Sequence, residues 1–414
     1  MAPQDQGHLG FCGASRKLAK EMPYSKKKVN NCLNIRDLRA LARKNLPDAM
    51  FHYMDGAADD EITLARNTQA FNNYELMPNY LVDVEEVKLK TKILGQKLDL
   101  PFFLSPTGMN RLFHHEKELA VARAADSFGT LYSLSTVATS SIEEISTAID
   151  GPKMFQIYIH KDEGLTREFV QRSKDSGYAA LCLTVDVPTA GYRERELFYG
   201  MSMPPKLRYG NIVDFLKHPT WTSKLFLHPD FKLANVVARK DVIGKGVISL
   251  MDYFNTQLIP NVTWEHAERL IEEWGGPFAI KGLLTKEDAI KARNIGASAV
   301  MISNHGGRQL DSAPAPVDCV AEIRDAVGDD LELIVDGGIR RGTDVLKALA
   351  LGANAVSIGR AYLFGLAAGG EFGVLRALSL LRDEVIRDMA LLGTPTVQDI
   401  GSKHVRLSKT PVKS

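Results

Sequence analysis

Short apolar segments alternate with amphipathic ones along most of the chain. The apolar segments are brief and often contain β-branched or aromatic residues, as do strands that are buried on both faces of a parallel sheet. Strands are expected at 102–104, 130–134, 154–159, 179–185, 278–280, 299–302, 333–335 and 355–358. Helical patterns follow most of them, at 116–127, 165–174, 286–294, 317–326 and 343–351. This repeat predicts an α/β fold, a single (β/α)₈ TIM barrel, in preference to an open doubly wound sheet.

The segments outside this repeat define the domain organisation. The barrel domain is expected to span 34–402, with helices in 34–70 packed before its first strand. Residues 1–33 are basic and lack a helical apolar face, so a flexible N-terminal tail is expected there. Residues 403–414 are expected to form a C-terminal tail.

A long insertion interrupts the repeat after the fourth strand, at about 195–262. Within it, 214–231 combines aromatic residues and prolines without a clear period. A loop this long in a compact domain is usually functional or mobile. We expect either a lid over the active site or a surface that docks on a membrane or partner, because exposed aromatic groups are costly in water. The side chains concerned are Trp221, Leu225, Phe226 and Phe231.

Composition and charge limit the kinds of ligand and the cellular locations that are expected for this protein. The net charge is only +1, so no overall positive field would attract nucleic acid. The four cysteines are widely spaced, and the N-terminus has no apolar signal region. The adjacent His114 and His115 do not converge on one ion, so no metal site is expected. A cytoplasmic protein is expected, with peripheral contact at the inner face of the cytoplasmic membrane as the alternative.

Polar or small residues follow almost every expected strand. In a TIM barrel the carboxyl ends of the strands meet at one face, where active sites are built. We therefore expect one site that includes Pro106, Thr107, Gly108, Ser135, Gln156, Tyr158, Thr184, Asp186, Lys281, Ser303, His305, Asp336, Gly337, Gly338, Arg340, Gly359 and Arg360.

The residues that follow two of these strands are suited to binding a phosphate group. Gly337-Gly338 and Gly359 follow the last two strands, where barrels commonly bind phosphate through backbone N–H groups and a helix N-terminus. Arg340 and Arg360 add guanidinium groups that suit phosphate oxygens.

Other residues favour acid–base chemistry. His305 precedes two glycines and Arg308, and Asp186 can reach it across the barrel mouth to favour its protonated form. Arg308 and Arg193 could grip a carboxylate. Burying the charge of Lys281 costs free energy unless a partner or ligand compensates for it. Three roles for this side chain remain open: to form a Schiff base, to pair with an acidic side chain, or to face an anionic cofactor ring.

With these residues assembled, the chain resembles the FMN-dependent L-2-hydroxy acid oxidoreductases. The stretch SNHGGRQ, at 303–309, is that family's signature around its catalytic histidine. The resemblance runs over about 34–402 and covers every expected strand end. FHYMDGAADDE, at 51–61, and the Trp-containing insertion look most like the respiratory L-lactate dehydrogenases of that family.

The resemblance implies a role for each substrate residue. His305 is the active-site base, and Asp186 stabilises its protonated form. Arg308 and Arg193 hold the substrate carboxylate, with the hydroxyl of Tyr53 as a further donor. Tyr158 bonds the hydroxyl or keto oxygen of the substrate.

The resemblance also implies how FMN is bound. Lys281 lies near flavin N1 and the C2 carbonyl, and Ser303 lies near the ribityl chain or the polar edge of the ring. The residues that hold the isoalloxazine are Pro106, Thr107, Gly108, Ser135, Gln156 and Thr184. Asp336 binds the ribityl hydroxyls. The phosphate is bound by the backbone around Gly337, Gly338 and Gly359, with Arg340 and Arg360.

Two positions depart from other members of this family. Val137 stands where members with bulky active-site side chains have an aromatic residue, so it is expected to tune substrate shape. Gly108 stands where several oxidases carry alanine, which favours a dehydrogenase.

The expected activity is FMN-dependent oxidation of L-lactate, or of a similar small L-2-hydroxy acid, to the 2-keto acid. A quinone or cytochrome is the expected electron acceptor, 214–231 is the candidate membrane contact, and the family suggests a homotetramer. The alternatives are an oxidase that forms hydrogen peroxide and a flavin-binding barrel without catalysis.

Overall fold

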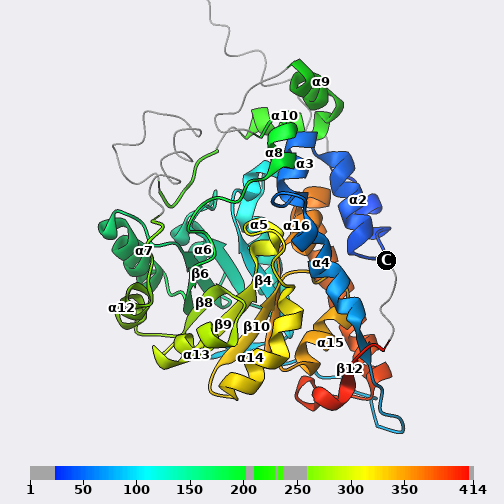
Figure 1. Ribbon diagram of the computed structural model, residues 1–414. Coiled ribbons are helices and arrows are strands. Elements are labelled where there is room, and N and C mark those ends of the chain that lie inside the picture. The colour runs from blue at the N-terminus through cyan, green and yellow to red at the C-terminus, as the bar shows by residue number, and fades with distance from the viewer. Residues whose placement is uncertain (1–23, 202–208, 229–230, 237–258, 410–414) are drawn as a thin grey trace, which may run out of the picture.

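Eight parallel strands form a closed barrel at the centre of the molecule (Figure 1). The computed structural model describes residues 24–201, 209–228, 231–236 and 259–409. Around the barrel the strand order is β10-β11-β4-β5-β6-β7-β8-β9. The strands are β4 (Phe102–Thr107), β5 (Tyr132–Ser135), β6 (Lys153–Ile157), β7 (Ala180–Thr184), β8 (Phe278–Leu283), β9 (Ala299–Ser303), β10 (Glu332–Asp336) and β11 (Ala355–Ile358). The predicted (β/α)₈ barrel is confirmed.

The strand register brings the polar strand ends to one level. Asp336 of β10 lies opposite Ser303 of β9, and Thr184 of β7 lies opposite Lys281 of β8. Because the strands are parallel, these residues share the carboxyl-end face of the barrel. The opposite end of the interior is filled by an apolar cluster that includes Phe103.

Helices surround the strands and bury their outer faces (Figure 1). They are α5 (Lys117–Ser127), α6 (Ile142–Ala148), α7 (Glu163–Asp175), α12 (Trp264–Trp274), α13 (Lys286–Asn294), α14 (Val320–Val327), α15 (Gly342–Ala350) and α16 (Arg360–Leu392). α16 is long and apolar enough to cross a membrane, but most of its apolar stretch is buried inside the protein. Non-helical dihedral angles at Gly369 and Gly370 kink it.

Helices at the start of the chain pack beside the barrel. They are α1 (Lys26–Asn30), α2 (Ile35–Asn45), α3 (Asp48–Asp55) and α4 (Ile62–Gln69). The prediction of a flexible tail over 1–33 is wrong for its described part. Val29 is fully buried, and the carbonyl of Cys32 accepts a hydrogen bond from Arg376 of α16 at 2.7 Å. The first 23 residues lie outside the described ranges.

The chain end is also part of the fold, so the prediction of a tail from 403 is wrong. β12 (Val405–Leu407) pairs antiparallel with β1 (Tyr74–Leu76). His404, just before it, is 1% exposed. A hairpin of β2 (Thr91–Ile93) and β3 (Gln96–Leu98) supplies Ile93, Leu94 and Leu98 to the apolar cluster at the amino end of the barrel. Residues 410–414 lie outside the described ranges.

The described parts of the insertion lie over the carboxyl end of the barrel (Figure 1). They include α8 (Glu194–Phe198), α9 (Tyr209–Lys217) and α10 (Pro219–Leu227). Trp221 is 4% exposed, stacks on Phe215 and donates to the carbonyl of Leu112 at 2.9 Å. Trp221 therefore takes no part in the membrane or partner contact that was one of the two expectations for 214–231. Leu216 and Phe226 are exposed instead, at 72% and 77%.

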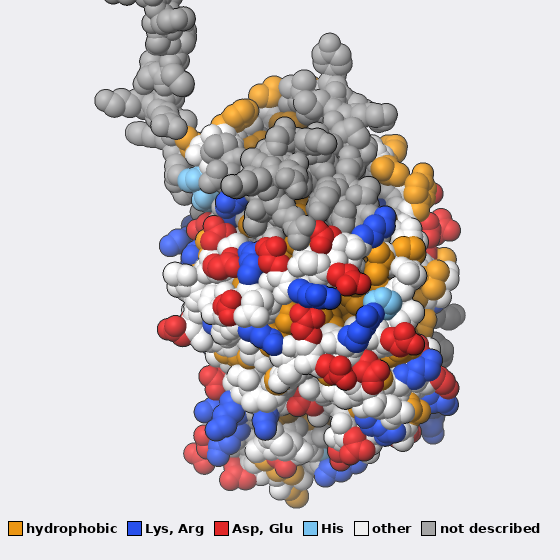
Figure 2. Space-filling view, turned by 90° about the vertical axis from the view of Figure 1, so that its left-hand side faces the viewer, with side chains coloured by type: hydrophobic (Ala, Val, Ile, Leu, Met, Phe, Trp, Pro, Cys, Tyr) orange, Lys and Arg blue, Asp and Glu red, His pale blue; other side chains and the backbone are white. Residues whose placement is uncertain are grey.

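Short 3₁₀ helices complete the fold. They are η2 (Ala70–Asn73), η3 (Asn110–Leu112), η5 (His305–Gly307), η6 (Pro316–Cys319), η7 (Val397–Asp399) and η8 (Ser402–His404). On the face shown in Figure 2, acidic and basic side chains are interspersed, and hydrophobic side chains gather toward the upper end.

Candidate functional site

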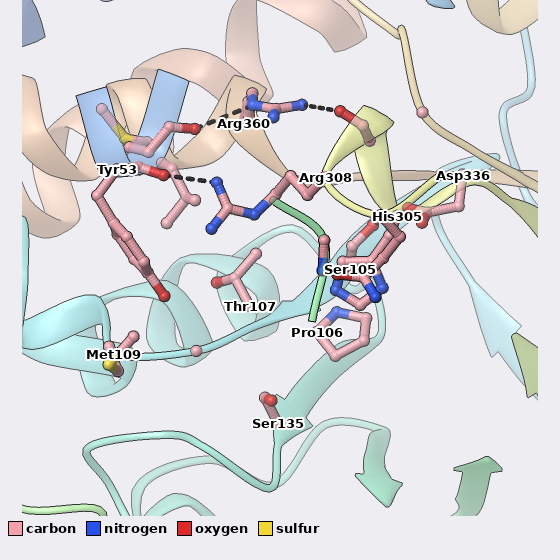
Figure 3. A pocket seen from close by; sticks show the side chains of 18 of the residues that line it. Tyr53, Ser105, Pro106, Thr107, Met109, Ser135, His305, Arg308, Asp336 and Arg360 are labelled. Carbon is pink, nitrogen blue, oxygen red and sulfur yellow. Dashed lines mark hydrogen bonds between the residues drawn. The ribbon is translucent and has the colours of Figure 1, made fainter. Parts of the chain in front are cut away.

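A cavity of about 590 Å³ opens at the carboxyl end of the barrel (Figure 3). Most of the predicted site residues line it: Tyr53, Pro106, Thr107, Gly108, Ser135, Val137, Tyr158, Arg193, Lys281, His305, Arg308, Asp336, Gly337, Gly338, Arg340, Gly359 and Arg360. Gln156, Thr184, Asp186 and Ser303 are not among its lining residues. The structure therefore brings the strand ends together and places four predicted residues behind the cavity wall.

His305 and Asp186 form a close pair at the mouth of the barrel. Nδ1 of His305 lies 2.9 Å from Oδ1 of Asp186, which leaves Nε2 as the nitrogen not engaged by the carboxylate. His305 has a positive φ of 57°, and the following Gly306 and Gly307 have φ values of 66° and 78°. These left-handed residues turn the chain sharply after β9, so the imidazole lines the cavity.

Burial and pairing act in opposite directions on this histidine. Burial lowers the pKa of His305 below its ordinary 6.5, although Asp186 acts to raise it. Burial alone would raise the pKa of Asp186, but His305 and Lys281 hold it below its ordinary value. The imidazole is therefore neutral at pH 7 and beside a charged carboxylate, the state that a general base requires.

Arg193, Arg308 and Tyr53 also line the cavity, and Figure 3 shows Arg308 beside Tyr53. Arg308 donates from Nη1 to the carbonyl of Tyr53 at 2.6 Å, and its guanidinium lies 4.9 Å from the centre of the Tyr53 ring. Nε of Arg193 donates to the carbonyl of Arg308 at 3.3 Å. The two guanidinium groups are thus held by main-chain contacts and face the same cavity.

Glu196, on α8, joins these two arginines and was missed by the sequence analysis. Its Oε1 lies 2.8 Å from Nη2 of Arg308, and its Oε2 lies 3.5 Å from Nη1 of Arg193. The glutamate is 6% exposed and lines the cavity. The spacing of three residues from Arg193 on a helix was the available signal. Such pairs usually lie on protein surfaces, and burial is what distinguishes this one.

Gln309 was missed as well, although it adjoins Arg308. Its Nε2 donates to the carbonyls of Asp186 and Thr189, at 3.1 and 2.8 Å. Its Oε1 accepts from Arg193 at 3.4 Å. This side chain ties the loop after β9 to the loop after β7.

Lys281 and Asp336 form a buried ion pair inside the barrel, 2.9 Å apart. Asp336 also accepts hydrogen bonds from the hydroxyls of Ser105, Ser303 and Ser357, at 2.5, 2.7 and 2.7 Å. Burial opposes both charges. The pair nevertheless holds the pKa of Asp336 well below its usual value and that of Lys281 above its own. Of the three readings of Lys281, the structure shows the acidic partner.

The arginine after β11 is engaged by main-chain groups (Figure 3). Nε of Arg360 donates to the carbonyl of Met54 at 2.9 Å. Nη1 and Nη2 donate to the carbonyls of Gly306 and Gly56 at 2.8 and 2.7 Å. Burial and the neighbouring arginines lower the pKa of Arg360 to about 9. Arg360 thus joins the start of the chain to the loop of His305.

The residues expected around a phosphate lie together at the end of β10 and β11. Gly337 and Gly338 have φ values of 133° and 82°, in the region that favours glycine. Gly359 is the N-cap residue of α16, so the first N–H groups of that helix begin here. Arg340 also lines the cavity and donates to the adjacent carbonyl of Ile339 at 2.8 Å.

Several buried polar atoms of the residues behind the cavity have no hydrogen-bond partner within the described protein. They include Nε2 of Gln156 and Oγ1 of Thr184, as well as Oδ2 of Asp186. The other side-chain atom of Gln156 accepts from the hydroxyl of Ser135 at 2.9 Å. An unpaired buried donor costs free energy, so these atoms indicate a missing polar ligand.

Gly108 and Val137 are in close contact. A Cβ placed on Gly108 would lie 2.5 Å from Cγ2 of Val137 and 3.2 Å from its carbonyl oxygen. An alanine at position 108 would therefore require Val137 to move. The two positions that depart from the family pattern are sterically coupled in this chain.

Comparisons with known proteins agree with this geometry. Residues 42–407 match the model of the FMN-dependent dehydrogenase family. An L-lactate oxidase from a Nostoc species is 42% identical over 92% of this chain and 99% of its own length. An L-lactate dehydrogenase from Pectobacterium atrosepticum is 38% identical over 88% of this chain and 95% of its own length.

A solved structure is similar over the same region. The monotopic membrane protein (S)-mandelate dehydrogenase superposes with a TM-score of 0.88, at 35% identity, over 91% of this chain and 100% of its own. With a matching family model over most of the chain, and an acid–base pair and arginine pair in one barrel cavity, the chain belongs to the FMN-dependent dehydrogenase family and is an oxidoreductase with FMN as its cofactor.

Proposed function

We propose that the protein oxidises L-lactate, or a similar small L-2-hydroxy acid, to the 2-keto acid. The observation that carries this proposal is that His305, which is paired with Asp186, lines the same cavity as Arg193 and Arg308. A 2-hydroxy acid needs a base for one proton and cations for its carboxylate, and both lie here. Relatives that are named lactate dehydrogenase and lactate oxidase support the choice of substrate.

Different residues of this chain bind different groups of the substrate. Arg193 and Arg308 bind the carboxylate, with the hydroxyl of Tyr53 as a further donor. Tyr158 bonds the oxygen on C2, and burial keeps its hydroxyl protonated by raising its pKa. When bound, FMN would accept the two electrons that C2 loses. In a hydride route His305 receives the hydroxyl proton, while the C2 hydrogen leaves together with the electron pair. In a carbanion route His305 receives the C2 proton, and the hydroxyl proton is released as the electron pair leaves and the keto group forms.

The cavity has polar groups that fit FMN. The unpaired atoms of Gln156 and Thr184 suit the polar edge of the flavin ring, together with Ser135 and the backbone of 106–108. Lys281 brings a positive charge to the ring, and Asp336 and Ser303 lie beside it for the ribityl chain. Gly337, Gly338, Gly359, Arg340 and Arg360 form the phosphate end.

The electron acceptor is proposed to be a quinone or cytochrome at the inner face of the cytoplasmic membrane. Gly108 favours a dehydrogenase, and a similar structure is that of a monotopic membrane protein. Exposed Leu216 and Phe226 are the proposed contact within 214–231. A homotetramer is proposed from family resemblance. The alternative, an oxidase that forms hydrogen peroxide, is supported by the similar lactate oxidase.

The deciding experiment is anaerobic reduction of the FMN-loaded protein with a panel of L-2-hydroxy acids and their D enantiomers. We expect L-lactate or a similar small acid to bleach the flavin, and a quinone to reoxidise it faster than oxygen does. Faster reoxidation by oxygen supports the oxidase. Retention of colour with every acid supports a flavin-binding barrel without catalysis and overturns the proposal.

His305→Ala tests the residue assignment in the same assay. The variant should keep FMN but lose substrate-dependent bleaching, because the proton has no acceptor. Bleaching at a near-normal rate would show that His305 is not the base.

A further inference from the structure

The cations proposed to bind the substrate carboxylate already share a carboxylate of the protein. Glu196 contacts Arg308 at 2.8 Å and Arg193 at 3.5 Å, one oxygen to each guanidinium. The side chain of Glu196 is 8% exposed, and those of the two arginines are 16% and 24% exposed. All three residues line the cavity. Their charges therefore act on a bound anion with little screening by water.

The helix that carries Glu196 is fixed in this orientation by its neighbour. Arg195 pairs with Asp55 at 3.1 Å and with Glu61 at 2.8 Å. Asp55 is held in turn by Arg39 at 2.6 Å. These contacts attach α8 to α3 and to the residue before α4. This network of ion pairs thus directs Glu196 into the cavity.

The effect of Glu196 is visible in the ionisation of the two arginines. Burial opposes the charge of Arg308, yet Glu196 and other neighbours raise its pKa above its ordinary value. Burial and the charge of Arg308 lower the pKa of Arg193, and the more distant Glu196 offsets this only in part. Two like charges this close repel each other, and the glutamate is the counter-ion that stabilises both.

We infer that Glu196 is a specificity-determining residue that fixes the charge of this arginine cluster and selects monoanions over dianions. Two positive charges and one negative charge leave +1, which matches one substrate carboxylate. A second carboxylate on the ligand would lie close to Glu196 without a cation left to bind it. The inference deepens the proposed function and rests on it.

The test compares two unreactive three-carbon acids, propionate and malonate, which carry one and two charges at neutral pH. Their dissociation constants are measured by calorimetry with FMN-loaded wild type and Glu196→Gln. The wild type should prefer propionate. In Glu196→Gln that preference should fall by about tenfold or more, because a buried charge a few ångströms away has been removed.

Two further variants separate charge from structure. Glu194→Gln removes a carboxylate that is exposed on the same helix, and it should leave both dissociation constants unchanged. Glu196→Asp keeps the charge, so both acids should weaken together with their ratio preserved. Equal weakening of both acids in Glu196→Gln would show a purely structural role and overturn the inference.

The outcome is distinguishable from failure of the proposed function. If lactate bleaches the wild-type flavin but the acid preference does not change in Glu196→Gln, only this inference fails. If no 2-hydroxy acid bleaches the wild type, the proposed function fails. If Glu196→Gln does not retain FMN, the preference between the two acids is compared in the wild type and Glu196→Asp instead. A wild-type preference for malonate then contradicts the inference.

Discussion

His305 and Asp186 come from strand ends that are separated by much of the chain, yet their side chains lie 2.9 Å apart. Neither residue identifies a base by itself, because most histidines and aspartates in proteins are structural. The short apolar strands make the pair predictable, since alternate strand ends of a barrel must converge. The same convergence brings Arg308, three residues after His305, into the lining of the cavity.

The contribution of Asp186 should appear in the pH dependence of flavin reduction. Burial places the pKa of His305 below 6.5, so the wild-type rate should fall only as the pH drops through that lower value. Asp186 acts to raise this pKa, so Asp186→Asn should move the acid limb to lower pH. The maximal rate should also fall, by roughly 10²–10⁴-fold, because the imidazolium formed in the reaction loses its counter-charge.

Stopped-flow measurements of anaerobic flavin reduction over a pH series, with both proteins, provide this comparison. An acid limb at the same pH in wild type and Asp186→Asn would mean that another group controls the rate.

Glu196 shows where prediction from sequence reached its limit at the level of the residue. An acid three positions after an arginine usually indicates an exposed ion pair. Its burial depends on α8 being attached to α3 and to Glu61 by Arg195, a contact between distant segments that no local pattern records.

At the level of the element, the strands that were predicted from the sequence are longer than those that were missed. All eight barrel strands were predicted because each is an apolar run bounded by polar ends. β1, β2, β3 and β12 have only three residues each, too few to show a period. The helices α9 and α10 were not predicted, because apolar residues that are exposed in the fold, such as Leu216 and Phe226, stand among buried ones such as Trp221 and obscure a helical period.

The pairing of β12 with β1 gives the chain end a measurable role. Ending the chain after Ser402 removes buried His404 and the partner of β1. Each lost hydrogen bond costs about 0.5–1.5 kcal/mol. The melting temperature should therefore fall by several degrees.

The matched control ends the chain after Lys409 and removes only residues outside the described fold. Calorimetric melting of both truncated proteins with FMN bound makes the comparison. Equal melting temperatures would contradict a structural role for β12.

At the level of the whole molecule, the exposed apolar residues of the insertion lie at the same end as the cavity (Figure 1). Leu216→Ser with Phe226→Ser should reduce binding to anionic phospholipid vesicles by roughly tenfold or more, since burying a large apolar side chain contributes about 1.5–3 kcal/mol. Activity with a soluble dye should not change. Neither side chain lines the cavity or is buried in the fold.

A vesicle sedimentation assay gives the fraction of bound protein. Tyr80→Ser is the control, because Tyr80 is 81% exposed and lies near β1, which pairs with β12 at the far end of the barrel. Loss of binding in this control, or none in the double variant, would place the contact elsewhere.

The apolar cluster at the amino end of the barrel has a consequence for the order of events in turnover. Its side chains, with the β2–β3 hairpin beneath them, fill the interior below the Lys281–Asp336 pair. Within the described residues the amino end of the barrel is therefore closed, and the proposed substrate and its keto acid product would share the opening at the carboxyl end. If the proposed acceptor also enters there, we expect double-displacement kinetics, in which the keto acid competes with the acceptor for the reduced enzyme.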